Sequence, residues 1–185
     1  MRIIGGKFKG KKLLLPKNKD TRPLRDIVKE SIFNIVNHSN LINLNIENSN
    51  ILDLFSGSGS FGLECISRGA KKVIFIEKKV EAIDILKKNL RDFDNYKVIE
   101  QDCFKYFEYK RNLEIFFDII FLDPPFKELK INNIIDNIVK FKLLKDNALM
   151  IIHRHKKDDI KISDKVKIIK KCYYGISKIY FCILR

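Results

Sequence analysis

The sequence predicts a doubly wound α/β fold, a mostly parallel seven-stranded sheet with an antiparallel C-terminal hairpin. Short apolar runs alternate with helical patterns between residues 50 and 152. A glycine-rich loop directly follows the first of these runs and opens a helical pattern. Residues 166–184 instead hold two strand-like runs joined through Gly175, which is typical of an antiparallel hairpin at a sheet edge.

The five strands of the alternating region are short and rich in Ile, Val, Leu and Phe, as expected of strands buried on both faces. They are expected at residues 50–55, 72–77, 97–101, 116–123 and 148–152, and the hairpin adds strands at 166–173 and 178–184. The helices between them are expected through residues 64–68, at 80–90, around 104–109 and at 131–141. Gly69 ends the first of these helices, as a glycine after a helix commonly does.

The first 40 residues are expected to form a basic extension ahead of a main domain at residues 41–185. Residues 2–4 and 12–15 are expected to form a small β-hairpin, because glycines and lysines separate them. A helix over residues 25–37 follows, since its apolar side chains recur at helical spacing. We therefore expect a small hairpin and helix to precede the sheet.

Charge is unevenly distributed along the 185 residues, whose net charge is +14. Residues 1–30 and 151–185 each carry 10 basic and 3 acidic side chains, whereas residues 31–150 are neutral overall. A genome rich in A and T would raise the lysine count, but it would spread the charge evenly. Concentration at the two ends favours a polyanionic partner, either nucleic acid or an anionic membrane.

Several classes of protein are excluded early. The longest apolar run, residues 179–184, has six residues and is too short to span a membrane. The apolar stretch near the N-terminus, residues 13–15, is too short for a signal peptide. A cytoplasmic protein is therefore expected. The cysteines show no zinc spacing, so no metal is expected. His38, His153 and His155 are interpreted as structural or solvent-facing.

The glycine-rich loop Gly57-Ser58-Gly59-Ser60-Phe61-Gly62 predicts a nucleotide-type cofactor. Alone it is compatible with NAD, FAD or S-adenosylmethionine. Glu77 ends the second strand 20 residues after Gly57, where a carboxylate can accept hydrogen bonds from ribose hydroxyls. Asp102 follows the third strand and is expected to meet the adenine amine.

Asp53 helps to choose among these cofactors. It precedes the loop in the run Asp53-Leu54-Phe55-Ser56-Gly57, and a carboxylate next to the loop would repel the pyrophosphate of a dinucleotide. S-adenosylmethionine carries a sulfonium and an ammonium and has no phosphate. The position of Asp53 therefore favours S-adenosylmethionine.

The fourth strand ends in Asp123-Pro124-Pro125-Phe126, which predicts the methylation of an exocyclic amine. Two prolines make a rigid loop with free carbonyls. The Asp123 carboxylate and the Pro124 carbonyl could accept both hydrogens of a weakly nucleophilic amine. Phe126 could stack against a nucleobase that has left its helix.

These motifs resemble those of class I S-adenosylmethionine-dependent methyltransferases, and most of the chain resembles the bacterial 16S ribosomal RNA guanine-N2 methyltransferases, with a looser match in the lysine-rich C-terminal region. The segments that carry the narrower resemblance are residues 1–13, Thr21-Arg22-Pro23, Val28-Lys29-Glu30, Phe33-Asn34, residues 55–59, Gly62-Leu63-Glu64, Ser67-Arg68-Gly69-Ala70 and Asp123–Phe126. The family has Thr where this chain has Leu24. The loop and the proline motif indicate only the superfamily, and the N-terminal block points to the family.

The resemblance implies a Rossmann-like fold and a role for each candidate residue. S-adenosylmethionine would contact Asp53, Gly57, Gly59, Glu77 and Asp102, while Asp123 and Pro124 hold the target amine and Phe126 stacks on the base. Residues 1–40 would bind RNA, with phosphate contacts from Arg2, Lys7, Lys9, Lys11, Lys12, Arg22 and Arg25. The partner would be 16S rRNA, within the small ribosomal subunit or its assembly intermediate, and the protein a monomer.

Three alternatives remain at this point. An adenine-N6 methyltransferase acting on DNA or RNA would use the same pocket, although no target-recognition domain for duplex DNA is evident. A basic nucleic-acid-binding module without catalysis is disfavoured by the intact glycine and proline motifs. A nicotinamide-dependent oxidoreductase ranks last, because neither Asp53 nor the proline loop has a role in it.

Overall fold

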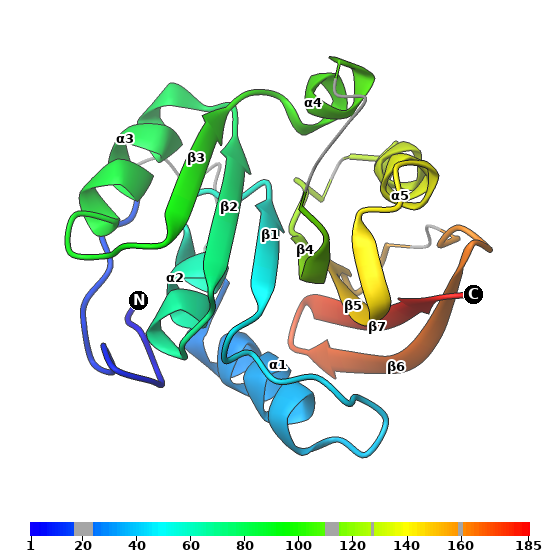
Figure 1. Ribbon diagram of the computed structural model, residues 1–185, viewed down its shortest axis with the longest axis horizontal. Coiled ribbons are helices and arrows are strands. Elements are labelled where there is room, and N and C mark those ends of the chain that lie inside the picture. The colour runs from blue at the N-terminus through cyan, green and yellow to red at the C-terminus, as the bar shows by residue number, and fades with distance from the viewer. Residues whose placement is uncertain (17–23, 110–114, 127, 159–160) are drawn as a thin grey trace.

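The computed structural model describes residues 1–16, 24–109, 115–126, 128–158 and 161–185. Seven strands form one sheet in the order β3-β2-β1-β4-β5-β7-β6 (Figure 1). They are β1 (Asn50–Leu54), β2 (Lys72–Glu77), β3 (Tyr96–Glu100), β4 (Phe117–Leu122), β5 (Leu144–His155), β6 (Val166–Tyr174) and β7 (Ser177–Leu184). The first five pair in parallel and β7 is antiparallel to both of its neighbours, so the predicted fold class is confirmed.

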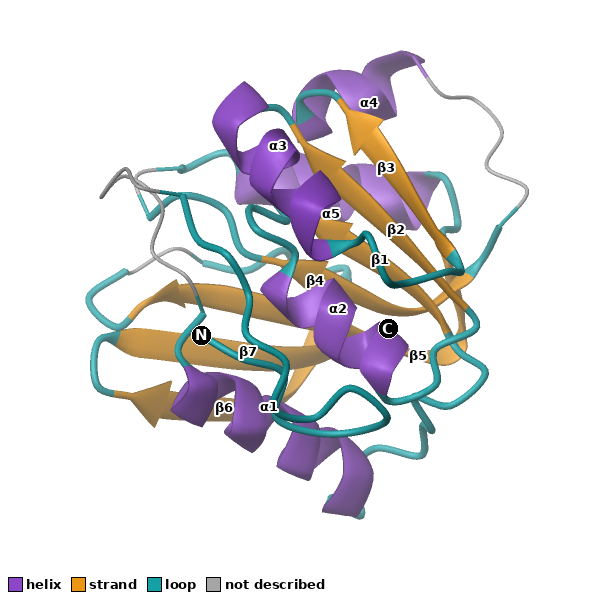
Figure 2. Cartoon of the chain, turned by 90° about the vertical axis from the view of Figure 1, so that its left-hand side faces the viewer, coloured by secondary structure: helices purple, strands orange, loops and turns teal. Residues whose placement is uncertain are grey.

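Helices cover both faces of the sheet (Figures 1 and 2). They are α1 (Asp26–His38), α2 (Ser60–Ser67), α3 (Val80–Asn89), α4 (Cys103–Tyr109) and α5 (Ile131–Lys140). The apolar side chains of α1, α2 and α3 join one buried cluster, and those of α4 and α5 join the other. Along each strand the buried side chains join the two clusters alternately, because successive side chains point to opposite faces of a sheet.

Two elements differ from the sequence prediction. β5 runs from Leu144 to His155, well beyond the apolar run at residues 148–152, because His153 and Arg154 are buried and continue its pairing with β7. Within residues 1–16, the predicted hairpin is reduced to a single antiparallel bridge between Arg2 and Lys12. Positive φ angles at Gly6 and Gly10 turn the chain too tightly for a longer ladder between them.

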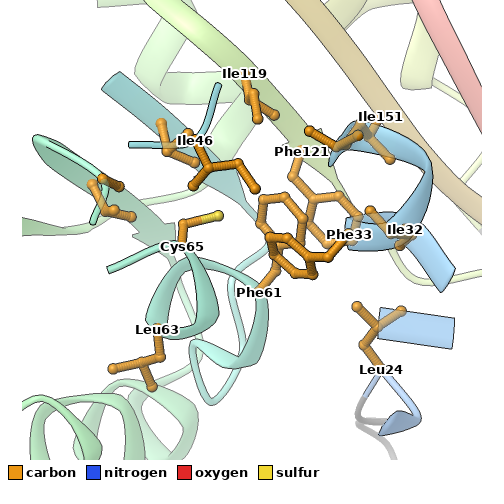
Figure 3. Packing of buried hydrophobic residues seen from close by; sticks show 14 of the residues in the cluster. Leu24, Ile32, Phe33, Ile46, Phe61, Leu63, Cys65, Ile119, Phe121 and Ile151 are labelled. Atoms are coloured by element: carbon orange, nitrogen blue, oxygen red, sulfur yellow. The ribbon is translucent and has the colours of Figure 1, made fainter. Parts of the chain in front are cut away.

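Three stacked aromatic rings join the N-terminal helix to the sheet (Figure 3). The ring centroid of Phe61 on α2 lies 5.3 Å from that of Phe33 on α1 and 4.0 Å from that of Phe121 on β4. All three side chains are buried. Since large aromatic side chains contribute strongly to core stability, α1 is part of the main core.

The segment before α1 lies along α2. The Lys7 amide donates a hydrogen bond to the Ser67 carbonyl, and the Ser67 hydroxyl donates to the Gly5 carbonyl. Ile3 and Leu13 bury their side chains in the same cluster as α1 and α2. In the described part of the chain, no helix is long and apolar enough to cross a membrane.

Candidate active site

A cavity of about 440 Å³ opens at the carboxyl ends of β1 and β4. The strand order changes direction between these two strands, and open α/β sheets bind their ligands at such a point. Its wall includes Asp53, Phe55, Gly57, Glu77, Gln101, Phe104, Asp123, Pro124, Phe126 and His153. The sequence-predicted cofactor and amine motifs therefore meet in one place.

Glu77 connects the loop after β1 to the end of β2. Its Oε2 accepts a hydrogen bond from the Gly57 amide at 2.8 Å. Its Oε1 accepts from the amides of Lys78 and Lys79, each at 2.9 Å. Gly57 has a φ of 55°, and a Cβ there would meet no atom within 4 Å, so its backbone borders open space. The loop is thus held by a carboxylate while its glycine leaves the cavity free.

Asp53 is a buried carboxylate in the cavity wall, with 1% of its surface exposed. Its Oδ2 accepts a hydrogen bond from the Gly62 amide at 3.0 Å. Burial raises its pKa well above the usual value; the Gly62 hydrogen bond opposes this, while the carboxylates of Asp123 and Glu77 add to it. A cationic ligand beside Asp53 would offset the cost of burying its charge and favour its ionised form.

Two predicted cofactor residues do not line the cavity. A Cβ on Gly59 would lie 2.3 Å from Cδ1 of Leu86, so this glycine permits the close approach of α3. Asp102 accepts hydrogen bonds from the Lys78 ammonium at 2.7 Å and from the Phe104 amide at 2.8 Å. Burial opposes the ionisation of Asp102, but these donors outweigh it and lower its pKa. Gln101 and Phe104 line this part of the cavity instead.

Asp123 lies directly after β4, and its Oδ1 is 2.7 Å from Nδ1 of His153. The Pro124 carbonyl accepts no hydrogen bond from the described residues. Phe126 is half-buried, and its ring centroid lies 5.6 Å from that of His153 and 5.1 Å from that of His155, both edge-on. Asp123, Pro124 and Phe126 thus line one cavity.

His153 is the site residue that sequence reasoning missed. Interpreted above as structural or solvent-facing, it instead lines the cavity, with 5% of its surface exposed. Leu122 pairs with Ile152, so the next residues of these parallel strands, Asp123 and His153, are neighbours. A prediction that extended the fifth strand by one residue, from Ile152 to His153, would have placed His153 beside Asp123.

Arg154 holds the proline loop from within the protein. It is 1% exposed, and its Nη2 donates to the carbonyls of Phe126 at 3.1 Å and Glu128 at 2.9 Å. Its Nε donates to Oδ2 of Asp158 at 2.6 Å. Five donors in a rigid fork suit a guanidinium to bind several carbonyls at once. The buried guanidinium of Arg154 therefore stabilises the proline loop.

The predicted RNA-contacting residues differ in their exposure. Side chains of Arg2, Lys7, Lys9, Lys12 and Arg25 are exposed, and Arg22 lies outside the described residues. Lys11 is half-buried, pairs with Asp92 and lies over the Phe93 ring, 5.2 Å from its centroid. Pro16 and Leu24 both line the cavity, so the N-terminal segment reaches the site.

Residues 1–183 match the protein family described as Conserved hypothetical protein 95. The chain belongs to this family. Among its relatives, Ribosomal RNA small subunit methyltransferase D of Haemophilus influenzae is 34% identical over 180 residues, covering 95% of this chain and 90% of that protein. The protein of the same name from Buchnera aphidicola subsp. Baizongia pistaciae is 36% identical over 156 residues, or 83% and 76% of the two chains. The resemblance to small subunit rRNA methyltransferases is confirmed.

Solved structures similar to this chain have the same fold. A methyltransferase of Escherichia coli is 27% identical, with a TM-score of 0.82 over 98% of this chain and 96% of that one. A methylase of Haemophilus influenzae is 31% identical, with a TM-score of 0.78 over 98% and 96%. Family and fold together make this chain a class I S-adenosylmethionine-dependent methyltransferase.

Proposed function

We propose that this methyltransferase modifies the exocyclic N2 amine of a guanine in 16S rRNA of the small ribosomal subunit. The observation that carries methylation of an exocyclic amine is the arrangement of Asp123 and Pro124. Both residues line the same cavity as Gly57, where the strand order changes direction between β1 and β4. The names of the relatives support rRNA of the small subunit as the substrate.

The cavity suits S-adenosylmethionine in charge and in shape. Asp53 offers a carboxylate to a cationic group, and Gly57 presents backbone beside open space. Phe104 and Gln101 offer an apolar face and an amide to an adenine ring. When bound, S-adenosylmethionine supplies an electrophilic methyl group. We assign its ribose end to Glu77, because Oε2 accepts a hydrogen bond from Gly57 and has the capacity to accept a second one from a ribose hydroxyl.

Asp123 and Pro124 would make the amine reactive. The lone pair of an exocyclic amine is delocalised into its base and is a poor nucleophile. Acceptors for both amine hydrogens favour a pyramidal nitrogen and stabilise the positive charge that develops on it. The rigid proline loop, resting on Arg154, would hold the nitrogen in line with the methyl group. Phe126 would hold the splayed-out base by stacking.

Residues 1–40 would bring the RNA to this cavity. Their exposed basic side chains suit phosphates, which supply affinity without sequence information. The segment packs on α2 and lines the cavity at Pro16 and Leu24, so RNA bound to it would lie beside the site. We retain residues 1–40 as an RNA-binding extension on this ground.

Guanine N2 is favoured over adenine N6 by the family resemblance alone. The carboxylate and carbonyl acceptors fit either amine, and a methyltransferase specific for adenine would use the same cavity. Adenine N6 in DNA or RNA is therefore the alternative.

One experiment distinguishes these substrates. S-adenosylmethionine labelled in its methyl group is offered with unmodified small subunits, naked 16S rRNA, tRNA and duplex DNA, and the labelled nucleotide is mapped. We expect label on a guanine N2 of 16S rRNA. Label confined to adenine would overturn the proposal.

Replacing Asp123 tests the role of the acceptors. We expect Asp123→Ala to abolish methylation, because the amine loses its charged acceptor, while S-adenosylmethionine affinity stays within a few-fold. Calorimetric titration and single-turnover rates check the two parts. Unchanged turnover would remove Asp123 from the mechanism.

A further inference from the structure

We propose that His153 is a positioning residue for Asp123, and that Ser177 anchors the other nitrogen of the His153 ring. The inference rests on the proposed function of Asp123 and deepens it. Asp123 lies directly after β4, His153 in β5 and Ser177 at the start of β7, and these are three neighbouring strands of the sheet. The three side chains form a chain of hydrogen bonds from the cavity wall into the protein.

The distances support two good hydrogen bonds. Nδ1 of His153 lies 2.7 Å from Oδ1 of Asp123, and Nε2 lies 2.8 Å from Oγ of Ser177. An ionised carboxylate can only accept, so His153 must carry its hydrogen on Nδ1 and donate it to Asp123. The bare Nε2 then accepts the Ser177 hydroxyl hydrogen. Asp123, which can only accept, thereby sets the tautomer of the neutral ring, and Ser177 complements it by donating to Nε2.

Burial makes this arrangement rigid. His153 and Ser177 are 5% and 7% exposed, so water cannot easily replace either partner. The rings of His153 and Phe126 also pack in a T-shaped arrangement, with centroids 5.6 Å apart and an interplanar angle of 82°. One imidazole therefore touches both the carboxylate and the aromatic ring that we assign to the target base. It can fix the distance between them.

The consequence concerns the two carboxylate oxygens of Asp123. With Oδ1 held by His153, rotation of the carboxylate is restricted and Oδ2 becomes the acceptor for the amine. Without the histidine, the carboxylate is free to rotate and bind water. Misplacement of a reacting group by about 1 Å can lower a rate on the order of 100-fold.

Two substitutions separate positioning from packing. His153→Asn retains an amide nitrogen near the place of Nδ1, whereas His153→Gln carries its amide farther out, toward Ser177. We expect the asparagine variant to keep kcat within about tenfold of the native protein, and the glutamine variant to lose on the order of 100-fold. The KM for S-adenosylmethionine and the melting temperature should change little in both. His38→Asn, at the exposed end of α1, is the matched control.

Several outcomes would overturn the inference. Equal kcat values for the asparagine and glutamine variants would mean that contact with Asp123 is unimportant. Parallel losses of S-adenosylmethionine affinity and melting temperature would mean that His153 only maintains the fold. If the native protein labels no RNA guanine, the proposed function fails instead, and the ring state of His153 still tests the inference.

A spectroscopic readout of that ring state is independent of activity. The ¹⁵N chemical shifts of the His153 ring report which nitrogen carries the hydrogen. We expect the Nδ1–H tautomer in the native protein, and its loss in Asp123→Ala. A native ring protonated only on Nε2 could not donate to an ionised Asp123, and the inference would be wrong.

Discussion

The Lys29 ammonium on α1 lies 3.5 Å from Oε2 of Glu64 on α2, and neither side chain is exposed. Burial lowers the pKa of Lys29, whereas the Glu64 and Asp26 carboxylates raise it. The same pair binds the start of the chain. Lys29 donates to the Arg2 carbonyl at 2.6 Å, and Oε2 of Glu64 accepts from the Ile4 amide at 2.8 Å. The N-terminal segment is therefore attached to α2 through a buried ion pair.

Removing the cation should destabilise the protein. We expect Lys29→Met to lower the free energy of unfolding by about 3 kcal/mol, because it leaves a buried carboxylate short of one partner. Arg68, which donates to Oε1 of Glu64 at 2.8 Å, keeps the loss from being larger. Urea unfolding measures it. Lys87→Met, which removes an exposed pair with Glu100, is the control and should leave stability unchanged. Equal stability of both variants would contradict the buried-pair account.

Asp53 should make stability and cofactor affinity depend on pH in opposite ways. Its pKa is raised in the folded protein, so above the usual value of 3.8 the native state holds a proton that the unfolded chain has lost. The stability contributed by this group therefore falls as pH rises from 3.8 toward the raised value. Affinity for a cationic ligand rises over the same range, because the ligand favours ionised Asp53.

Asp53→Asn tests both parts of that prediction. The amide oxygen can still accept from Gly62 but does not titrate, so the melting temperature of the variant relative to the native protein should increase between pH 5 and pH 8. Its affinity for S-adenosylmethionine should be weaker at pH 8 and nearly independent of pH. A melting difference that is constant with pH would show that Asp53 titrates normally.

Gly62 and Gly57 of the glycine-rich loop should differ in their roles, the first in folding and the second in cofactor binding. A Cβ on Gly62 would lie 2.3 Å from the buried Phe75 ring, so Gly62→Ala should lower the free energy of unfolding by about 1–3 kcal/mol. Gly57→Ala meets no atom and should cost about 1 kcal/mol for its positive φ, but its methyl group would enter the cavity and weaken S-adenosylmethionine binding. Melting curves and calorimetric titration of both variants separate fold from site. Identical binding losses would contradict the assignment.

The N-terminal lysines should set the salt dependence of RNA binding. Changing Lys9, Lys11 and Lys12 together to Ala should flatten the plot of log affinity against log salt, by about 0.7–0.9 for each phosphate that is no longer neutralised. Lys11 should contribute least, because it already pairs with Asp92. Filter binding of 16S rRNA at several salt concentrations gives the slope. Lys145→Ala is the control. Lys145 lies near the start of β5, at the end away from His153, and pairs with Asp118. An unaltered slope in the triple variant would mean that this charge does not bind RNA.

The local pattern of the chain was enough to predict the sheet, its antiparallel hairpin and the motifs at its carboxyl edge. Apolar runs and glycines indicate burial and backbone conformation, which depend on residues that are close together in the sequence. For the same reason Asp53, Gly57, Glu77 and Asp123 could be assigned to one cavity: parallel strands bring their ends to one edge.

What depends on side-chain partners was decided only by the tertiary structure. Nothing in the sequence near Asp102 shows that Lys78, 24 residues earlier, occupies its carboxylate, or that Leu86 rather than a ligand explains Gly59. His153 looked structural because its partners, Asp123 and Ser177, lie 30 and 24 residues away. The sequence alone determined which helices and strands form and which strand ends lie at the same edge of the sheet. The fold decided which polar groups satisfy one another and which remain for a ligand, because buried hydrogen bonds join atoms that are close in space and distant along the chain.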